Sequence, residues 1–458
     1  MEMIKPIPAS FKDPDGFIFN HNNTLYRLVT DNYQESYRHF MDSGLYQELI
    51  DKNLLIAHTE VASPVTNDIH AFKILLPEQI SFISYPYEWG FDQWKEVLVN
   101  FLTINRIALQ YGMILKDATP FNFTFYKGRP LFIDSLSFII YKEGDPWIAY
   151  RQFCESMLGP FALIKYNGPN WVKQFSSFID GIQLSYISKE LPFFSRFNLT
   201  VMIHIHLHAS YEGKEGYGAA AYSVFNTQKL NELFLLIASS LQKWKHPVVK
   251  KAHWITYYDE QILSKKYLAE KEKLIDEWLI DLAGNRLTDL GANNGKFSII
   301  AAKYFKEVIA VESDADCIDD LYSQFSKSSI TNITAVLADL MQPSPGLGWN
   351  NAEREPLLKR LRADTVLGLA LIHHLCIVHN LPLRYFASFI SSVANQYAII
   401  EFIPKSDPMV SHMLQSREDI FYQYTEEEFR KCFEEYFTLV KVQQPARVNR
   451  SVYLWQKK

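Results

Sequence analysis

A glycine-bearing loop with two acidic residues downstream is the part of this sequence whose residue types and spacing best suit chemistry. Residues 286–297 read RLTDLGANNGKF, which places Asp289, Gly291 and Gly295 around one tight turn. Glycines allow a ligand to approach the main chain closely. Glu312 follows Asp289 by 23 positions, and an acid at about that distance can accept hydrogen bonds from the hydroxyls of a ribose. The pattern predicts a pocket for a nucleoside-like cofactor.

A third acid extends this pocket. Asp339 follows the apolar run of ITAVLADL, residues 333–340, where it can accept a hydrogen bond from the exocyclic amine of an adenine. Asn293 stands where many such loops have another glycine, and asparagine tolerates left-handed backbone better than most residues. The expected cofactor-binding residues are Asp289, Gly291, Asn293, Gly295, Glu312, Asp339, Leu340 and Ala370.

Two histidines and a glutamate are the candidate catalytic residues. His373 and His374 follow the apolar run 363–372, and Glu401 ends a second apolar run at YAIIE. At the ends of neighbouring strands these side chains would face one cleft, and a histidine or glutamate there could act as a general base. His374 is the first candidate and Glu401 the second. An orienting role in the loop is an equally open alternative for each.

The elements that must position these residues follow a regular order. After about residue 250, apolar strand-like runs alternate with helical patterns, which predicts a parallel sheet with crossover helices. A charged amphipathic helix is expected over 259–282, after a junction at 242–251. The long connection 343–354 is expected at the carboxyl edge of the sheet, either as a substrate-contacting loop or as a plain surface loop.

These residues and their order resemble a class I S-adenosylmethionine-dependent methyltransferase over residues 250–458. The residues that carry the resemblance are the loop Asp289–Gly295, Glu312, Asp339, the stretch Ala370–His374 and the helical YTEEEF. The resemblance implies an α/β, Rossmann-like fold with a seven-stranded sheet, mostly parallel, and one antiparallel strand near its edge. It also implies S-adenosylmethionine as cofactor, with Gly291 and Gly295 under the methionine part.

A narrower resemblance covers most of the chain, to a family of methyltransferase-like proteins that includes the NoeA nodulation protein. It is carried by PSPGLGWNNAER, LALIHHL, IIEFIPKSDP and REDIFYQYT. We expect an enzyme that methylates a small-molecule or glycan-type acceptor, with O-methylation favoured. The chain lacks an N/D-P-P-Y/F stretch after the fourth strand, which argues against methylation of nucleic-acid bases. A phosphotransferase and a non-catalytic interaction protein are the alternatives.

The N-terminal half contains a second set of polar residues. Asp117, Asn122 and Asp134 lie in ILKDATPFNFTFYKGRPLFIDSLSF, a layout that resembles the catalytic loop of protein kinases. The resemblance implies Asp117 as base, with Asn122 and Asp134 as metal ligands. However, Ser135 and Leu136 follow Asp134 in place of Phe-Gly, no glycine-rich loop precedes it, and Arg27 is a weak substitute for the usual lysine. A degenerate α+β kinase-like domain is expected.

This division gives the expected domains. The kinase-like domain covers residues 1–245, with a small lobe to about 85 and a helical lobe over 86–245, and the methyltransferase domain covers 250–458. The first domain could bind a nucleotide. His204, His206 and His208 invite a zinc interpretation, but the flanking pattern is helical and would spread them around a helix. No metal site is expected.

Composition excludes several classes of protein. The 458 residues are 48% hydrophobic and 21% charged, which suits packed cores rather than disorder. The formal net charge of −5 gives no global basic excess, so nucleic acid is not expected as a partner. The four cysteines are scattered without a CxxC pair, and no apolar run is long enough to span a bilayer. A cytoplasmic protein without a membrane partner is expected.

Overall fold

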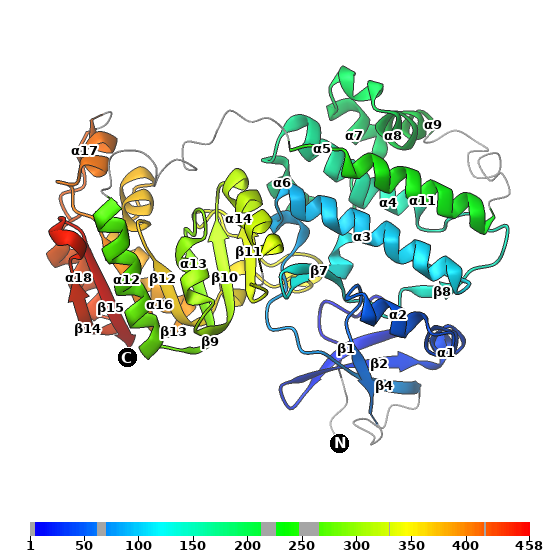
Figure 1. The fold of residues 1–458 in the computed structure, drawn as a ribbon, viewed down its shortest axis with the longest axis horizontal. Helices are drawn as coiled ribbons and strands as arrows, with labels where there is room; N and C mark the ends of the chain where they lie inside the picture. Colours follow the sequence, from blue (N-terminus) through cyan, green and yellow to red (C-terminus); the bar gives the residue numbers. More distant parts are fainter. Residues whose placement is uncertain (1–4, 62–69, 212–225, 247–264, 329, 416–417) are drawn as a thin grey trace. The chain divides into compact units, whose positions relative to one another are not determined.

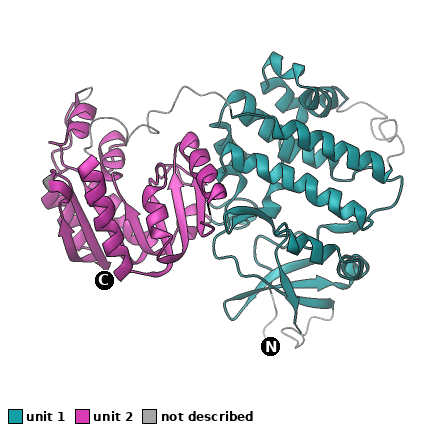
Figure 2. Cartoon of the chain, viewed as in Figure 1, with its two compact units in different colours: residues 1–249, 346–355 teal, residues 250–345, 356–458 magenta. Residues whose placement is uncertain are grey.

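The computed structural model of the chain forms two compact units (Figure 2). Unit 1 comprises residues 1–249 and 346–355, and unit 2 comprises residues 250–345 and 356–458. The expected junction at 242–251 lies partly outside the described residues, as does the start of the helix expected over 259–282. The structure describes residues 5–61, 70–211, 226–246, 265–328, 330–415 and 418–458.

A four-stranded antiparallel sheet, in the order β1-β2-β4-β3, begins unit 1 (Figure 1). Its elements are β1 (Gly16–His21), β2 (Thr24–Thr30), α1 (Gln34–Asp42), α2 (Leu45–Asp51), β3 (His58–Glu60) and β4 (Ala71–Pro77). Asn22 and Asn23 form the tight turn between the first two strands, both at positive φ, where asparagine is enriched. Tyr37 and Phe40 of α1 are buried and help form the core of this part.

The remainder of unit 1 is largely helical. Its helices are α3 (Phe91–Gln110), α4 (Tyr150–Phe153), α5 (Gly159–Asn167), α6 (Trp171–Gln174), α7 (Leu184–Glu190), α8 (Leu199–Val201), α9 (His208–Tyr211) and α11 (Thr227–Gln242), with the π-helical turns η4 (Cys154–Leu158) and η7 (Met202–Leu207) and the 3-10 helix η6 (Phe193–Phe197). Two short antiparallel pairs join β5 (Met113–Leu115) to β8 (Phe138–Ile140) and β6 (Phe123–Tyr126) to β7 (Arg129–Phe132). The assignment of this unit as kinase-like stays a prediction.

Residues 346–355 belong to unit 1, although the chain on both sides of them belongs to unit 2. Lys12 Nζ donates a hydrogen bond to Glu353 Oε2 at 3.0 Å, and the backbone N–H of Glu355 donates to the Tyr85 hydroxyl at 3.1 Å. The Arg354 guanidinium lies 4.4 Å from the centroid of the Phe121 ring. Most of the connection expected over 343–354 is therefore held by unit 1.

Unit 2 contains a seven-stranded sheet in the order β11-β10-β9-β12-β13-β15-β14 (Figure 1). Its strands are β9 (Gly284–Leu290), β10 (Phe305–Glu312), β11 (Ile333–Leu337), β12 (Ala363–Gly368), β13 (Ala394–Phe402), β14 (Phe437–Gln443) and β15 (Ser451–Lys457). The first five pair in parallel, and β15 runs antiparallel to both of its neighbours. The sheet expected from the resemblance is confirmed, including its antiparallel strand near one edge.

Helices pack on the sheet of unit 2 through two apolar clusters. The helices are α12 (Lys265–Asp281), α13 (Lys296–Ala301), α14 (Ala315–Lys327), α15 (Leu357–Arg360), α16 (Leu383–Val393), α17 (Pro408–Leu414) and α18 (Glu426–Glu434). Alternation along β15 separates the clusters, because successive side chains of a strand point to opposite faces. Val452 and Leu454 join the core made with α12, α13 and α14, whereas Trp455 stacks on Phe433 of α18.

No helix in the described part of the chain is long and apolar enough to cross a membrane.

Candidate cofactor site

The loop between β9 and α13 has the backbone that its residue types predict. Gly291 and Gly295 have φ of 76° and 74°, and Asn293 has φ of 48°. A Cβ atom on Gly295 would lie 2.7 Å from Leu321 Cδ2, so any other residue here would force the Leu321 side chain of α14 to shift. The amides of Gly291 and Ala292 each donate to the Val311 carbonyl oxygen at 2.9 Å. The loop is therefore fixed against the carboxyl end of β10.

Glu312 lies at the end of β10 and binds this loop directly. Its Oε2 accepts a hydrogen bond from the backbone N–H of Asn293 at 2.9 Å. Its Oε1 accepts from the backbone N–H groups of Ser313 and Asp314 at 2.6 and 3.0 Å, and from the Ser313 hydroxyl at 3.1 Å. The main-chain amides of Asn293, Ser313 and Asp314 are thus hydrogen-bonded within the protein. The carboxylate has a fixed orientation before any ligand arrives.

A cavity of about 280 Å³ opens beside this carboxylate. It is lined by Gly291, Asn293, Val311, Glu312, Ser313, Ala338, Asp339, Leu340, Leu369, Ala370, Leu371, His374, Leu375, Val378 and His379. Six of the eight expected cofactor residues are in this lining, which combines acidic groups with an aliphatic wall. Its volume approaches the lower end of the usual range for small-molecule pockets.

Two of the expected cofactor residues, Asp289 in β9 and Gly295 at the end of the loop, are not in the lining of the cavity. Asp289 is 2% exposed and accepts a hydrogen bond from the Ser298 hydroxyl at 2.7 Å. Burial raises the pKa of Asp289 to about 6, against the lowering effect of the Ser298 hydrogen bond. These contacts fix the turn that carries Gly291 and Asn293.

The two adjacent histidines have different environments. His374 lines the cavity at the start of the π-helical turn η9 (His374–Val378), and burial lowers the pKa of its imidazole to about 4. His373 is fully buried, and neither of its ring nitrogens has a hydrogen-bond partner among the described residues. Burial places the pKa of His373 well below its usual value. The expectation that His373 faces the cleft is wrong, because the turn directs its side chain into the core.

The expectation that Glu401 faces the cleft is also wrong. Glu401 lies inside β13 with no exposed surface, and its Oε2 is 2.6 Å from Lys271 Nζ of α12. The same oxygen accepts a hydrogen bond from the backbone N–H of Ala370 at 2.8 Å, and Oε1 accepts from the Tyr267 hydroxyl. Burial opposes ionisation, but the charges of Lys271 and Arg450 lower the pKa of Glu401. Both carboxylate oxygens of Glu401 are therefore bound within the protein, and one of them holds the segment that contains Ala370.

The contacts of Glu401 hold Ala370 in the conformation that it has in the wall of the cavity. It lines the cavity with φ of 52°, a left-handed conformation that costs roughly 1–2 kcal/mol for a residue with a Cβ atom. The hydrogen bond from its N–H to Glu401 helps to hold that conformation. Lys271 and Tyr267, which sequence reasoning missed, therefore support the cavity wall through Glu401. The available signal was Lys271 itself, a lysine on the apolar stripe of a helix between Leu268 and Leu274.

The polar residues of unit 1 gather as the sequence layout suggests, but Asp134 is already paired. Arg27 Nη1 lies 2.5 Å from Asp134 Oδ1, and the Asn122 side-chain amide donates to Asp134 Oδ2 at 3.4 Å. Burial, and then the charge of Asp134, raise the pKa of Asp117. Within the described residues no group of three or more His, Cys, Asp or Glu side chains could hold a metal ion. Arg27 supplies the positive charge at the position where the kinase resemblance implies a metal.

The three closely spaced histidines of unit 1 are structural. His204 Nδ1 lies 2.7 Å from the Tyr150 hydroxyl, and His206 lies 2.8 Å from each of two serine hydroxyls, those of Ser188 and Ser195. His208 stacks on the Tyr150 ring. Each histidine thus has its own neighbours within the protein.

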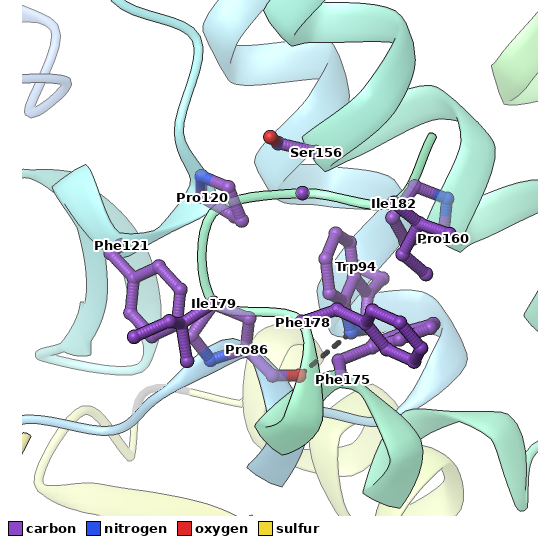
Figure 3. A pocket seen from close by; sticks show the side chains of 11 residues that line it. Pro86, Trp94, Pro120, Phe121, Ser156, Pro160, Phe175, Phe178, Ile179 and Ile182 are labelled. Carbon is purple, nitrogen blue, oxygen red and sulfur yellow. Dashed lines mark hydrogen bonds between the residues drawn. The ribbon is translucent and has the colours of Figure 1, made fainter. Parts of the chain in front are cut away.

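A second cavity lies in unit 1, where aromatic and proline side chains converge (Figure 3). Trp94, Phe175 and Phe178 lie near one another, and Trp94 Nε1 donates a hydrogen bond to the Pro86 carbonyl oxygen at 2.9 Å. The volume of this cavity is about 20 Å³, enough for about one water molecule. Phe178, which is 36% exposed, is part of its lining.

Comparison with known proteins identifies one relative that spans the chain. No family model matches. Nodulation protein NoeA of Rhizobium meliloti (strain 1021) is 28% identical over 461 residues, covering 98% of this chain and 96% of that protein. The 23S rRNA (uracil(1939)-C(5))-methyltransferase RlmD of Pseudomonas putida KT2440 is 33% identical over 72 residues, 16% of each chain.

The solved structures that match cover less of the chain. Magnesium protoporphyrin IX methyltransferase (ChlM) from Synechocystis PCC 6803, with bound SAH, is 18% identical with a TM-score of 0.31. The match covers 42% of this chain and 86% of that one. Over nearly its whole length, the chain is thus similar to the nodulation protein NoeA.

Proposed function

We propose that unit 2 is an S-adenosylmethionine-dependent methyltransferase that acts on a small-molecule or glycan-type acceptor, with O-methylation as the favoured outcome. The observation that carries the proposal is the cavity at the carboxyl ends of β9 to β12, with Glu312 and Asp339 in one lining. These residues and the glycine loop also carry the sequence resemblance to class I methyltransferases. Two acids beside an aliphatic wall suit a ligand with a polar nucleoside and an apolar ring face.

The residues present fit this cofactor. A Cβ atom on Gly291 would lie 3.3 Å from Leu371 Cδ1, closer than an ordinary contact, and the φ of Gly291 is 76°, so glycine suits this position in the lining. In the proposed complex Glu312 accepts hydrogen bonds from the ribose hydroxyls, one of them replacing the Ser313 hydroxyl, and Asp339 accepts from the adenine amine. The cofactor supplies an electrophilic methyl group when bound.

The pKa of His374 decides what this residue contributes. With a pKa of about 4 the imidazole is neutral at physiological pH, but it is too weak a base to hold a proton well. Alignment of acceptor and methyl donor can supply a large part of the rate in such a transfer. We therefore assign His374 to orienting the acceptor by a hydrogen bond, and Glu401 to positioning the Ala370 loop.

Isothermal titration of the full chain with S-adenosylmethionine and with S-adenosylhomocysteine tests the proposal. We expect binding heat with both ligands, and an affinity at least about tenfold weaker in Glu312→Ala, since a charged acceptor of a hydrogen bond is worth about 1.5–3 kcal/mol. Glu427→Ala, at an exposed position of α18, is the matched control and should bind as the wild type does. Absence of heat with the wild type, or unchanged affinity in Glu312→Ala, would overturn the proposal.

A further inference from the structure

Unit 1 exposes a group of large apolar side chains that no described element covers. Phe193 is 73% exposed, Phe194 58%, Phe197 80% and Leu199 71%. We call the following set the apolar patch: Tyr186, Phe193, Phe194, Phe197, Leu199 and Ile203. These residues lie on α7, η6, α8 and η7, which are neighbours in the fold (Figure 1).

The orientation of the helix that carries part of the patch is fixed by its polar face. Leu199, Ile203 and Leu207 recur every four residues, so they form one stripe along α8 and η7, and all three are exposed. His204 and His206, on the other side, are buried and lie within hydrogen-bond distance of side chains of unit 1. Turning the apolar stripe inward would break these contacts. The exposed stripe is therefore a stable property of the fold.

The charges around the apolar patch are mostly positive. Residues 184–211 contain three charged side chains, Lys189, Glu190 and Arg196. All three are exposed, and the Arg196 guanidinium lies 5.8 Å from the centroid of the Phe193 ring.

Further basic residues adjoin the patch through ring contacts. The Phe194 ring is 5.7 Å from that of Tyr166, which is 6.2 Å from the ring of Trp244. Lys165 precedes Tyr166, and Lys243 and Lys245 flank Trp244. The Lys165 ammonium donates to the Lys245 carbonyl oxygen, which confirms that these segments adjoin. Lys189 and Arg196 therefore border the patch together with Glu190, and Lys165, Lys243 and Lys245 lie in segments that adjoin it through the Phe194, Tyr166 and Trp244 rings, in a chain whose net charge is −5.

We propose that the apolar patch docks unit 1 on an anionic lipid surface. Exposed phenylalanine and leucine next to lysine and arginine is the composition of segments that lie in a membrane interface, and each basic residue near an anionic surface adds to the attraction. A second copy of the chain fits less well. A two-fold contact would place the basic border of the patch against itself, and like charges would repel. The docking is peripheral and adds a membrane contact to the proposed methyltransferase.

Co-sedimentation of the full chain with vesicles tests this proposal. Vesicles of equal parts phosphatidylcholine and phosphatidylglycerol should bind the wild type, and vesicles of phosphatidylcholine alone should bind it at least about tenfold less. Phe193→Ser with Phe197→Ser should reduce binding to the anionic vesicles by about tenfold or more. Arg196→Glu should also reduce it, and the loss should shrink at high salt because exposed charges are then screened.

Two controls separate docking from misfolding and from self-association. Tyr422→Ser removes an aromatic side chain that is equally exposed in unit 2, and it should leave vesicle binding unchanged. Because Phe193 and Phe197 make few buried contacts, their serine variant should keep the thermal unfolding midpoint of the wild type. Equal binding to both vesicle types, or no binding, would overturn the proposal. So would a dimer, seen by analytical ultracentrifugation without lipid, that the serine variant abolishes.

Discussion

The buried pair of Lys271 and Glu401 allows a quantitative test of how the cavity wall is supported. Lys271→Met removes the ammonium that lies 2.6 Å from Glu401 and leaves a carboxylate with no exposed surface, whose other nearby positive charge, Arg450, is itself paired with Asp407. Breaking a buried pair by removing one partner costs about 3–5 kcal/mol. The hydrogen bonds from Tyr267 and Ala370 to Glu401 remain, so we expect a loss near the lower end of that range.

Hydrogen–deuterium exchange followed by mass spectrometry is the appropriate assay, because it reports on each unit separately. A loss of about 3 kcal/mol corresponds to exchange about a hundredfold faster in the most protected amides of β12 and β13, at about 1.4 kcal/mol for each factor of ten. Peptides from β6 and β7 of unit 1 serve as the internal reference and should not change. Lys273→Met is the matched control on the same helix, since Lys273 is 78% exposed and only 3.7 Å from Glu277 in a surface pair.

A double-mutant cycle shows whether the two residues act together. Glu401→Gln loses the charge but keeps one oxygen that can accept from the Ala370 N–H, while its new amide NH2 can donate to the Tyr267 hydroxyl. The double variant with Lys271→Met should therefore lose much less stability than the two single losses added together. We expect a coupling energy of about 2–3 kcal/mol, as found for residues in direct contact. Additive losses, or an acceleration of β13 exchange below about tenfold in Lys271→Met, would refute the assignment of this pair as the support of Ala370.

Three further predictions concern the loop and the cavity. Gly295→Ala should lower the unfolding midpoint, with a loss of about 1–3 kcal/mol, because the new Cβ atom would lie 2.7 Å from Leu321 Cδ2 in a left-handed conformation; an unchanged midpoint would contradict this. Ala370→Gly should leave the free energy of unfolding unchanged or raise it by up to about 1 kcal/mol, since glycine adopts a φ of 52° without strain. A clear loss of stability would show instead that the methyl group of Ala370 contributes to packing. The pKa of His374, about 4 when folded and about 6.5 when unfolded, means that the unfolded state binds more protons between these values. Stability should therefore fall by about 2 kcal/mol as pH drops from 7 to 5, and denaturant unfolding of His374→Gln should lack this contribution; identical pH profiles for the two proteins would contradict it.

Much of unit 2 was predictable because its signals are local. The apolar runs before Gly291, Glu312 and Asp339 marked three parallel strands, and the carboxyl ends of parallel strands meet at one edge. The positive φ values of Gly291 and Asn293 follow from the conformational preferences of those residue types. The same reasoning placed six of the eight expected cofactor residues around one cavity.

The errors arose where a side chain depends on a distant element. His373 and His374 are adjacent in the chain, and only the π-helical turn η9 determines which of them reaches the cavity. Glu401 ends an apolar run, but α12 lies more than a hundred residues earlier in the chain and supplies the lysine that binds it. No local pattern connects these residues. In the sequence, the one indication of a buried partner for Glu401 is that Lys271 lies on the apolar stripe of a helix.

The placement of residues 346–355 in unit 1 determines how the protein can be dissected. The chain leaves unit 2 after Pro345, forms the contacts of Glu353 and Arg354 within unit 1, and re-enters unit 2 at Pro356. A fragment that starts at residue 250 would contain residues 346–355 but not Lys12, Tyr85 and Phe121, which these residues contact. Proteolytic separation of the two halves would thus leave residues 346–355 without the surface that they bind. To express the C-terminal half alone, these ten residues should be replaced by a short polar linker.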